Sequence, residues 1–235
     1  MENSSIIEIE NLIKRYPVGK SEFTALKGIT ASFGTGEFAG LVGPSGSGKT
    51  TLLNIIGSLD SPSEGDVFVL GRSVSSLTHK ESAKLRNNHI GFIFQTYNLL
   101  PVYTVYENVE FALLLQKLSG SERKKAVMDA LEWVGLTDKV KSRPSMLSGG
   151  ECQRVAIARS MVKRPEIVLA DEPTANLDSK NSHHILRTMK NLNRELKTTF
   201  IFATHDEKVM QYLNRIISLE DGKVVKDNFI TDSKN

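Results

Sequence analysis

The stretch Leu41–Thr51, LVGPSGSGKTT, decides the fold of this chain. It fits the pattern G-x-x-x-x-G-K-[ST], and it lies between an apolar run and a segment with helical spacing. Glycines in such a loop let backbone amides surround phosphate groups, and the following helix adds a partial positive charge at its N-terminus. The predicted phosphate-binding residues are Gly43, Pro44, Ser45, Gly46, Ser47, Gly48, Lys49, Thr50 and Thr51.

Two side chains of this loop have distinct expected roles. Lys49 would reach the β- and γ-phosphates of a nucleotide, and the hydroxyl of Thr50 would ligate Mg²⁺. A chance glycine-rich turn is the alternative. The apolar strand before the loop and the helix after it favour the nucleotide site.

The composition of the chain is that of an ordinary globular protein. Its 235 residues are 40% hydrophobic and 24% charged, enough for one domain with a subdomain. The net charge of +3 is small, and the basic clusters fit solvated helix faces, so we expect no nucleic-acid partner. The single cysteine excludes an internal disulfide and fits a reducing compartment.

The cellular location of the chain is predicted from two sequence features that we do not find, a signal peptide and a membrane span. The N-terminus has no basic start followed by an apolar core, as a signal peptide would. The longest apolar runs fall far short of the roughly 20 residues of a membrane span. We therefore expect a cytoplasmic chain that lies on the inner face of the membrane only through a partner.

The hydrophobic pattern changes twice along the chain. Residues 1–96 read as strands separated by glycine-rich turns, and strands alternate with helices again over 165–235. Residues 97–164 show helical spacing without a clear strand. We therefore expect one α/β domain over residues 1–235 with an inserted helical subdomain, whose helices are predicted at 107–117, 121–134 and 151–163.

A second motif, EIVLADEPT at residues 166–174, complements the first. Four apolar residues form a buried strand that ends in Asp171 and Glu172. Asp171 would hold the Mg²⁺ shell, and Glu172 would polarise the attacking water. The alternative is an acidic surface turn, but two carboxylates at the end of a buried strand are costly without a cation and a substrate.

Three further residues become candidate site residues once Asp171 and Glu172 are placed at the end of a buried strand. Gln95 ends a short buried strand and could reach the metal or the water, although alone it would be a surface amide. His205 ends another core strand, where it could contact the γ-phosphate and hold Glu172. Tyr16 could stack on a base, while packing beside a turn is the alternative.

The segment Met146–Arg154, MLSGGECQR, holds a second glycine turn at the start of a predicted helix. Such a turn also fits a phosphate group. A whole helical segment separates it from Lys49. This separation suggests that the second turn does not serve the nucleotide bound by its own chain.

Taken in order, these motifs resemble the ATP-binding subunit of ABC transporters over essentially the whole chain. The order is Tyr16, GPSGSGKT, Gln95, LSGGE, VLADEP, NLD at 176–178, and His205. The resemblance implies a RecA-like phosphate-loop ATPase core with an N-terminal antiparallel β subdomain and an inserted α-helical subdomain. It also implies ATP and Mg²⁺ as ligands.

The resemblance assigns further roles. Two copies of the chain would meet head to tail with two ATP molecules between them. Catalysis would use Glu172, His205, Lys49 and Gln95, and the metal ligands would be Thr50, Gln95 and Asp171. Tyr16 would contact the nucleotide of its own subunit. The partner's nucleotide would be capped by Ser148, Gly149 and Gly150, with Asp178 at the same interface.

The resemblance also narrows the biological role. The spans 53–67, 84–111 and 148–162 look like the lipoprotein-releasing and macrolide-exporter branch, the LolD and MacB types, with the cell-division FtsE type as a near neighbour. An integral membrane permease would dock near residues 95–108. A DNA or ribosome ATPase would be expected to carry a coiled-coil, zinc or second ATPase module. A division-site scaffold is the third hypothesis.

Overall fold

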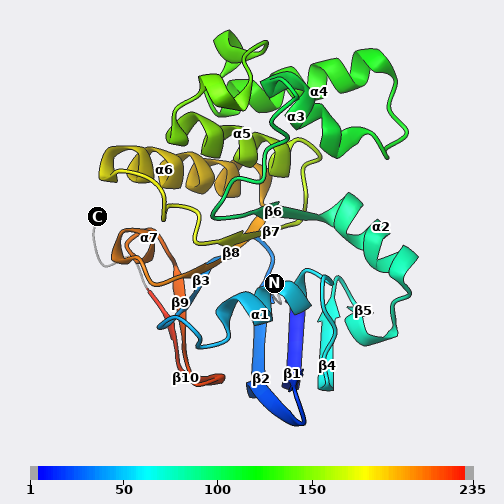
Figure 1. Ribbon diagram of the computed structural model, residues 1–235, viewed down its shortest axis with the longest axis vertical. Helices are drawn as coiled ribbons and strands as arrows, with labels where there is room; N and C mark the ends of the chain where they lie inside the picture. Colours follow the sequence, from blue (N-terminus) through cyan, green and yellow to red (C-terminus); the bar gives the residue numbers. More distant parts are fainter. Residues whose placement is uncertain (1–4, 231–235) are drawn as a thin grey trace.

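Strands β7 (Ile167–Asp171) and β8 (Thr199–Thr204) are neighbours in the interior of a six-stranded sheet in the computed structural model, which describes residues 5–230 (Figure 1). Both strands are buried runs, as expected for parallel strands covered on both faces. The sheet order is β10-β9-β3-β8-β7-β6, and only β10 runs antiparallel to its neighbour. The other strands are β3 (Phe38–Val42), β6 (Ile90–Ile93), β9 (Arg215–Glu220) and β10 (Lys223–Phe229).

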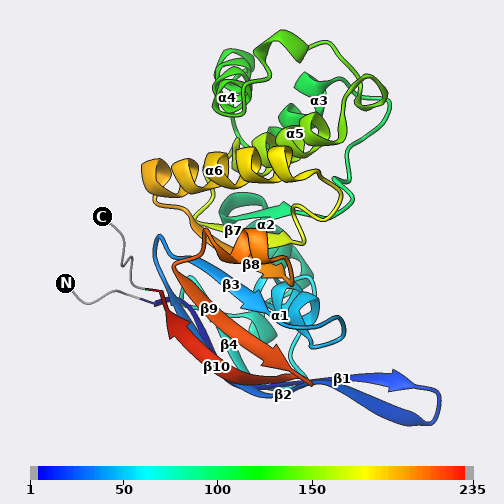
Figure 2. The same cartoon turned by 90° about the vertical axis from the view of Figure 1, so that its left-hand side faces the viewer.

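A second sheet, of four antiparallel strands, has the order β2-β1-β4-β5. The long strands β1 (Ser5–Val18) and β2 (Ser21–Gly34) form a hairpin that extends beyond the rest of the molecule (Figure 2). Several register shifts, which mark β-bulges or irregularities, interrupt the pairing along this hairpin. The sheet is completed by β4 (Glu64–Val69) and β5 (Arg72–Ser73).

The helices fall into two groups. Helix α1 (Lys49–Ile56) follows the glycine loop, α2 (His79–His89) precedes β6, and α6 (Ser179–Leu196) precedes β8. Helices α3 (Val105–Glu110), α4 (Gly120–Trp133) and α5 (Gly149–Met161) gather at the end of the molecule away from the antiparallel sheet (Figures 1 and 2). The division of the domain at residues 97 and 164 stays a prediction. The short helices are η1 (Val74–Ser76), η2 (Phe111–Leu113), η3 (Thr137–Lys139), η4 (Pro144–Met146) and α7 (Glu207–Met210).

The predicted helix at 107–117 is wrong over its second half. Helix α3 ends at Glu110, and a 3-10 turn, η2, replaces its continuation. Leu114 and Leu115 then lie in a turn with exposed fractions of 49% and 83%. Leu114 and Leu115 therefore lie at the surface, whereas Leu113 of the same apolar run is buried.

Two hydrophobic cores cover the two faces of the six-stranded sheet. Side chains alternate along each strand, so Phe200 and Phe202 pack with helices α3–α6, whereas Ile201 and Ala203 pack with α1 and the antiparallel sheet. The first core thus joins the helical segment to the sheet, and the second joins the two sheets. No helix within residues 5–230 is long and apolar enough to cross a membrane.

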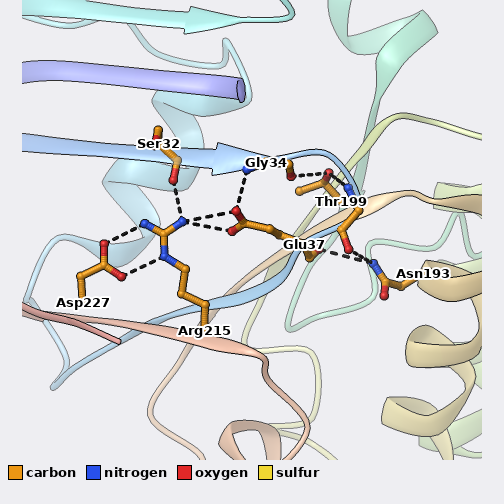
Figure 3. Close-up of polar contacts among 8 residues, drawn as sticks. Ser32, Gly34, Glu37, Asn193, Thr199, Arg215 and Asp227 are labelled. Atoms are coloured by element: carbon orange, nitrogen blue, oxygen red, sulfur yellow. Dashed lines mark hydrogen bonds and ion pairs between the residues drawn. The ribbon is translucent and has the colours of Figure 1, made fainter. Parts of the chain in front are cut away.

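One buried arginine connects the two sheets. Arg215 in β9 donates two hydrogen bonds to Asp227 of β10, at 2.8 and 2.7 Å (Figure 3). Its Nη1 atom donates to Glu37, at 3.1 Å, and to the carbonyl oxygen of Ser32 in β2, at 2.7 Å. Glu37 also accepts from the backbone amide of Gly34. The side chain of Arg215 is only 7% exposed, so these bonds lie largely out of water.

We expect Arg215→Met to lower the free energy of unfolding by about 3 kcal/mol, because two carboxylates would remain together without their cation. The measurement is the urea midpoint at neutral pH. Lys226→Met, an exposed position on β10, is the matched control and should leave the midpoint nearly unchanged. Equal midpoints for the two variants would contradict the role assigned to Arg215.

Candidate active site

The glycine loop between β3 and α1 forms a backbone cradle. Gly48, the N-cap of α1, has φ +99°, a conformation that glycine adopts without strain. A Cβ atom on Gly43 would lie 2.1 Å from the carbonyl oxygen of Leu219, so no side chain fits there. The turn of the β9–β10 hairpin contacts this loop, since the amide of Gly222 donates a hydrogen bond to the carbonyl oxygen of Ser47 at 3.2 Å.

Lys49 is held inside this loop. Its Nζ atom donates to the carbonyl oxygens of Gly43, at 2.7 Å, and Pro44, at 2.8 Å. Burial lowers the pKa of Lys49, while the nearby carboxylates of Glu172 and Asp171 act in the opposite direction. The loop therefore presents a cation that phosphate oxygens can bind in place of the two carbonyl groups.

The hydroxyl of Thr50 and the carboxylate of Asp171 face each other across the site. Thr50 Oγ1 lies 3.2 and 3.1 Å from the two carboxylate oxygens of Asp171. Burial raises the pKa of Asp171, an effect that a bound cation would oppose. Gln95 lines the same cavity and adds an amide oxygen. These hard oxygen donors fit Mg²⁺, which typically takes one or two carboxylates plus substrate phosphates.

Glu172 and His205 form a pair at the ends of β7 and β8. His205 Nδ1 lies 2.6 Å from Glu172 Oε1, and the hydroxyl of Thr204 donates to Glu172 Oε2 at 3.1 Å. Glu172 has φ +45°, a strained conformation for a residue with a side chain. Strain of this kind persists where the surroundings fix it, and here it directs the carboxylate into the site.

These side chains line one cavity of about 460 Å³. It brings together eight of the predicted loop and catalytic residues from the two motifs, together with Gln95 and His205. Phe23, Ala25 and Ala175 also line the cavity and were missed, because none of them was singled out as part of a motif. The lining residues from the predicted set are Ser45, Gly46, Gly48, Lys49, Thr50, Thr51, Gln95, Asp171, Glu172 and His205.

Tyr16 lies beside this cavity and does not line it. Its hydroxyl donates to Asp60 at 2.7 Å, and burial together with that bond raises the pKa of Tyr16. Tyr16 pairs directly with Phe23 across the β1–β2 hairpin, so the two rings share one face of the ribbon. This cross-strand position is the signal that could have identified Phe23.

The second glycine turn lies outside the cavity. Ser148 is the N-cap of α5, and it forms a capping box with Glu151. Gly150 packs closely on Asn181, where a Cβ atom would lie 2.7 Å from the amide oxygen. Asn181 in turn bonds to Asp178, the N-cap of α6. The structure thus places the second turn and Asp178 on a common surface that is separate from the cavity of the same chain.

Comparison with known proteins supports a family assignment. The family model described as ABC transporter matches residues 26–175, more than half of the chain. The chain is 44% identical over 225 residues to the macrolide export ATP-binding/permease protein MacB of Rhodopirellula baltica. That alignment covers 94% of this chain and 33% of MacB, so the chain spans about a third of this relative's length.

Other relatives match over their whole length. The ABC transporter ATP-binding protein MJ0796 of Methanocaldococcus jannaschii is 42% identical, with 94% of this chain and 96% of MJ0796 covered. The solved dimeric post-hydrolysis structure of MJ0796 bound to ADP and Pi superimposes with a TM-score of 0.88. It is 41% identical and covers 96% of this chain and 99% of that one. The chain therefore belongs to the ABC transporter family, as one of its ATP-hydrolysing cassettes.

Proposed function

We propose that this chain is the ATPase subunit that powers a separate integral membrane permease from the cytoplasmic face of the inner membrane. The observation that carries the proposal is the meeting of Lys49, Thr50, Asp171, Glu172 and His205 at one cavity. Each side chain there fits one requirement of phosphoryl transfer to water. The cavity and the family membership together support ATP as the substrate.

The proposed reaction uses these groups in order. Lys49 and the loop amides would bind the β- and γ-phosphates, and Thr50, Asp171 and Gln95 would hold Mg²⁺, whose charge would stabilise negative charge on the phosphate oxygens. Glu172 accepts a proton from the water that attacks the γ-phosphorus, and the bond to the bridging oxygen breaks to release ADP. His205, 2.6 Å away, keeps the carboxylate of Glu172 oriented.

The second glycine turn is the reason to propose a homodimer. Ser148, Gly149 and Gly150 begin helix α5, whose N-terminus favours a phosphate, but they do not line the cavity of their own chain. In a head-to-tail dimer they would cap the ATP of the partner, with Asp178 at the same interface. The relative MJ0796 has been solved as a dimer. ATP binding would then close the dimer, and hydrolysis would reopen it.

In this proposal, the permease selects the substrate that is transported. We propose docking near residues 95–108 and lipoprotein release of the LolD type. Macrolide or peptide export of the MacB type is supported equally well, by the 44% identity to a macrolide export protein over 94% of this chain. A cell-division ATPase of the FtsE type is the remaining alternative. No nucleic-acid partner is proposed.

Glu172→Gln should lower ATP turnover by about 10²- to 10⁴-fold, because the amide cannot accept the proton from water. ATP should still bind and should trap the closed dimer, measured by gel filtration with ATP. The control is Glu207→Gln, an exposed carboxylate on α7 outside the cavity. A variant that stays monomeric in ATP would refute Glu172 as the base.

Ser148→Arg should leave ATP binding to the monomer intact but abolish dimer formation and hydrolysis. Ser119→Arg is the matched control, because Ser119 is also an N-cap with a capping box, on α4, and loses the same cap energy of about 1 kcal/mol. The measurements are nucleotide affinity, gel filtration and turnover. Loss of nucleotide affinity in the isolated Ser148 variant would place the serine in its own subunit's site.

Purification from native membranes with an affinity tag tests the partner. We expect recovery with a four-helix permease that carries a large periplasmic domain. Recovery with ribosomes or DNA, after nuclease treatment and salt washes as controls, would contradict the transport role.

A further inference from the structure

Helix α5 carries a buried amide that contacts the segment after the acidic strand end. The side chain of Gln153 is 0% exposed, and its Nε2 atom donates to the carbonyl oxygen of Pro173 at 2.6 Å. A carbonyl oxygen only accepts hydrogen bonds, so the NH₂ group of the amide must face Pro173. Pro173 directly follows Glu172. A side chain from a different element therefore holds the residue next to the proposed general base.

Glu172 has a backbone conformation that its own sequence neighbour opposes. Its φ of +45° lies in the left-handed region, which residues with a side chain rarely adopt. A proline also restricts the residue before it and favours extended backbone there. The amide of Glu172 donates to the carbonyl oxygen of Ala203 at 2.9 Å, and its carbonyl oxygen accepts from the amide of Ala175 at 3.2 Å. Strain of this kind persists only where the surrounding contacts fix it.

Pro173 offers a single backbone group for such a contact. Proline has no N–H group, so its carbonyl oxygen is its only backbone group that forms hydrogen bonds. Gln153 binds this oxygen at a position that water does not reach. Without this bond, the peptide unit after Pro173 would be free to rotate. The carboxylate of Glu172 would then move away from His205, whose Nδ1 atom now lies 2.6 Å from it.

The amide of Gln153 costs stability where it lies. Its Oε1 atom is buried, and no protein group within residues 5–230 donates a hydrogen bond to it. A buried acceptor without a donor costs free energy. Other buried residues of α5 include Val155, Ile157 and Met161, so an apolar side chain of similar size would suit this helix. A polar residue that costs stability is expected where its chemistry serves a functional site.

We propose that Gln153 is a positioning residue for ATP hydrolysis. Its hydrogen bond to Pro173 holds Glu172 in the strained conformation that directs the carboxylate towards the attacking water. Gln153 does not line the nucleotide cavity, so it acts on the reaction only through Glu172. The inference rests on the proposed function, because it assumes that Glu172 is the base. The alternative is a hydrogen bond that only stabilises the fold.

Gln153→Met nearly keeps the size of the side chain and removes its N–H donor. We expect kcat to fall about 10- to 100-fold, because small displacements of a catalytic group have effects of this size. The affinity of the isolated monomer for ATP should stay unchanged, since Gln153 does not line the cavity. Wild-type kcat in the folded variant, or an equal loss of kcat and ATP affinity, would overturn the proposal.

Asn193→Leu is the matched control. Asn193 is also a buried amide, 7% exposed, and its Nδ2 atom donates to the carbonyl oxygen of Thr198 at 2.7 Å, outside the cavity. The substitution should lower the urea midpoint, because buried hydrogen bonds are lost, but leave kcat unchanged. An equal fall of kcat in this control would show that loss of stability explains the effect, and would overturn the role of Gln153.

A second variant keeps the test valid if Gln153→Met does not fold, as judged by circular dichroism. Gln153→Asn retains an amide, but its side chain is shorter by one carbon–carbon bond and cannot reach the carbonyl oxygen of Pro173. It should lower kcat as Gln153→Met does. Wild-type kcat in Gln153→Asn would contradict the proposal.

A double-mutant cycle separates positioning from stabilisation of the fold. If Gln153 acts through Glu172, adding Gln153→Met to Glu172→Gln should lower the residual turnover by less than about threefold, because residues that act as a unit are not additive. A hydrogen bond that only stabilises the fold would have the same effect in both backgrounds. Such an additive result would overturn the inference.

The wild-type chain and Glu172→Gln alone test the proposed function. Turnover by the wild type that is lost in Glu172→Gln but kept in Gln153→Met would refute only the positioning role. Full turnover in Glu172→Gln would refute the proposed base, whatever the result for Gln153→Met. No ATP turnover by the wild type would refute the proposed ATPase itself.

Discussion

The parallel register of β3, β7 and β8 is the constraint on which the rest of the structure depends. Val42 pairs with Thr204, and Asp171 pairs with Ala203, so the three strands end at the same edge of the sheet. The glycine loop, the two carboxylates and His205 follow directly from these ends. A slip of one residue would turn every side chain to the opposite face and separate the two hydrophobic cores. Packing on both faces therefore fixes the geometry of the site.

At this edge of the sheet, the site holds groups whose burial or backbone conformation costs free energy. Lys49 is buried beside two carboxylates, burial raises the pKa of Asp171, and Glu172 is held at positive φ. Each is held in place by contacts within the fold. The close packing of Gly150 on Asn181 fixes the second phosphate turn on another surface. One chain thus holds two glycine turns that lie on separate surfaces.

Helix α5 connects two segments that the sequence singled out, the second glycine turn and the loop after Gln95. Arg159 lies in the same helix that begins with the second glycine turn, and it bonds to the loop that follows Gln95. The second glycine turn and Arg159 therefore lie on one rigid element.

The amino-acid sequence by itself determined the glycine loop, the acidic strand end and the helices that follow the loop and lie near 121–134 and 151–163, because these depend on local spacing, capping and backbone freedom. It misassigned the helix after Glu110, because exposed apolar residues there follow the same spacing as buried ones. Only the tertiary structure placed Phe23 in the cavity with the glycine loop and the two carboxylates, since strand pairing and sheet packing bring together residues that are distant in the chain.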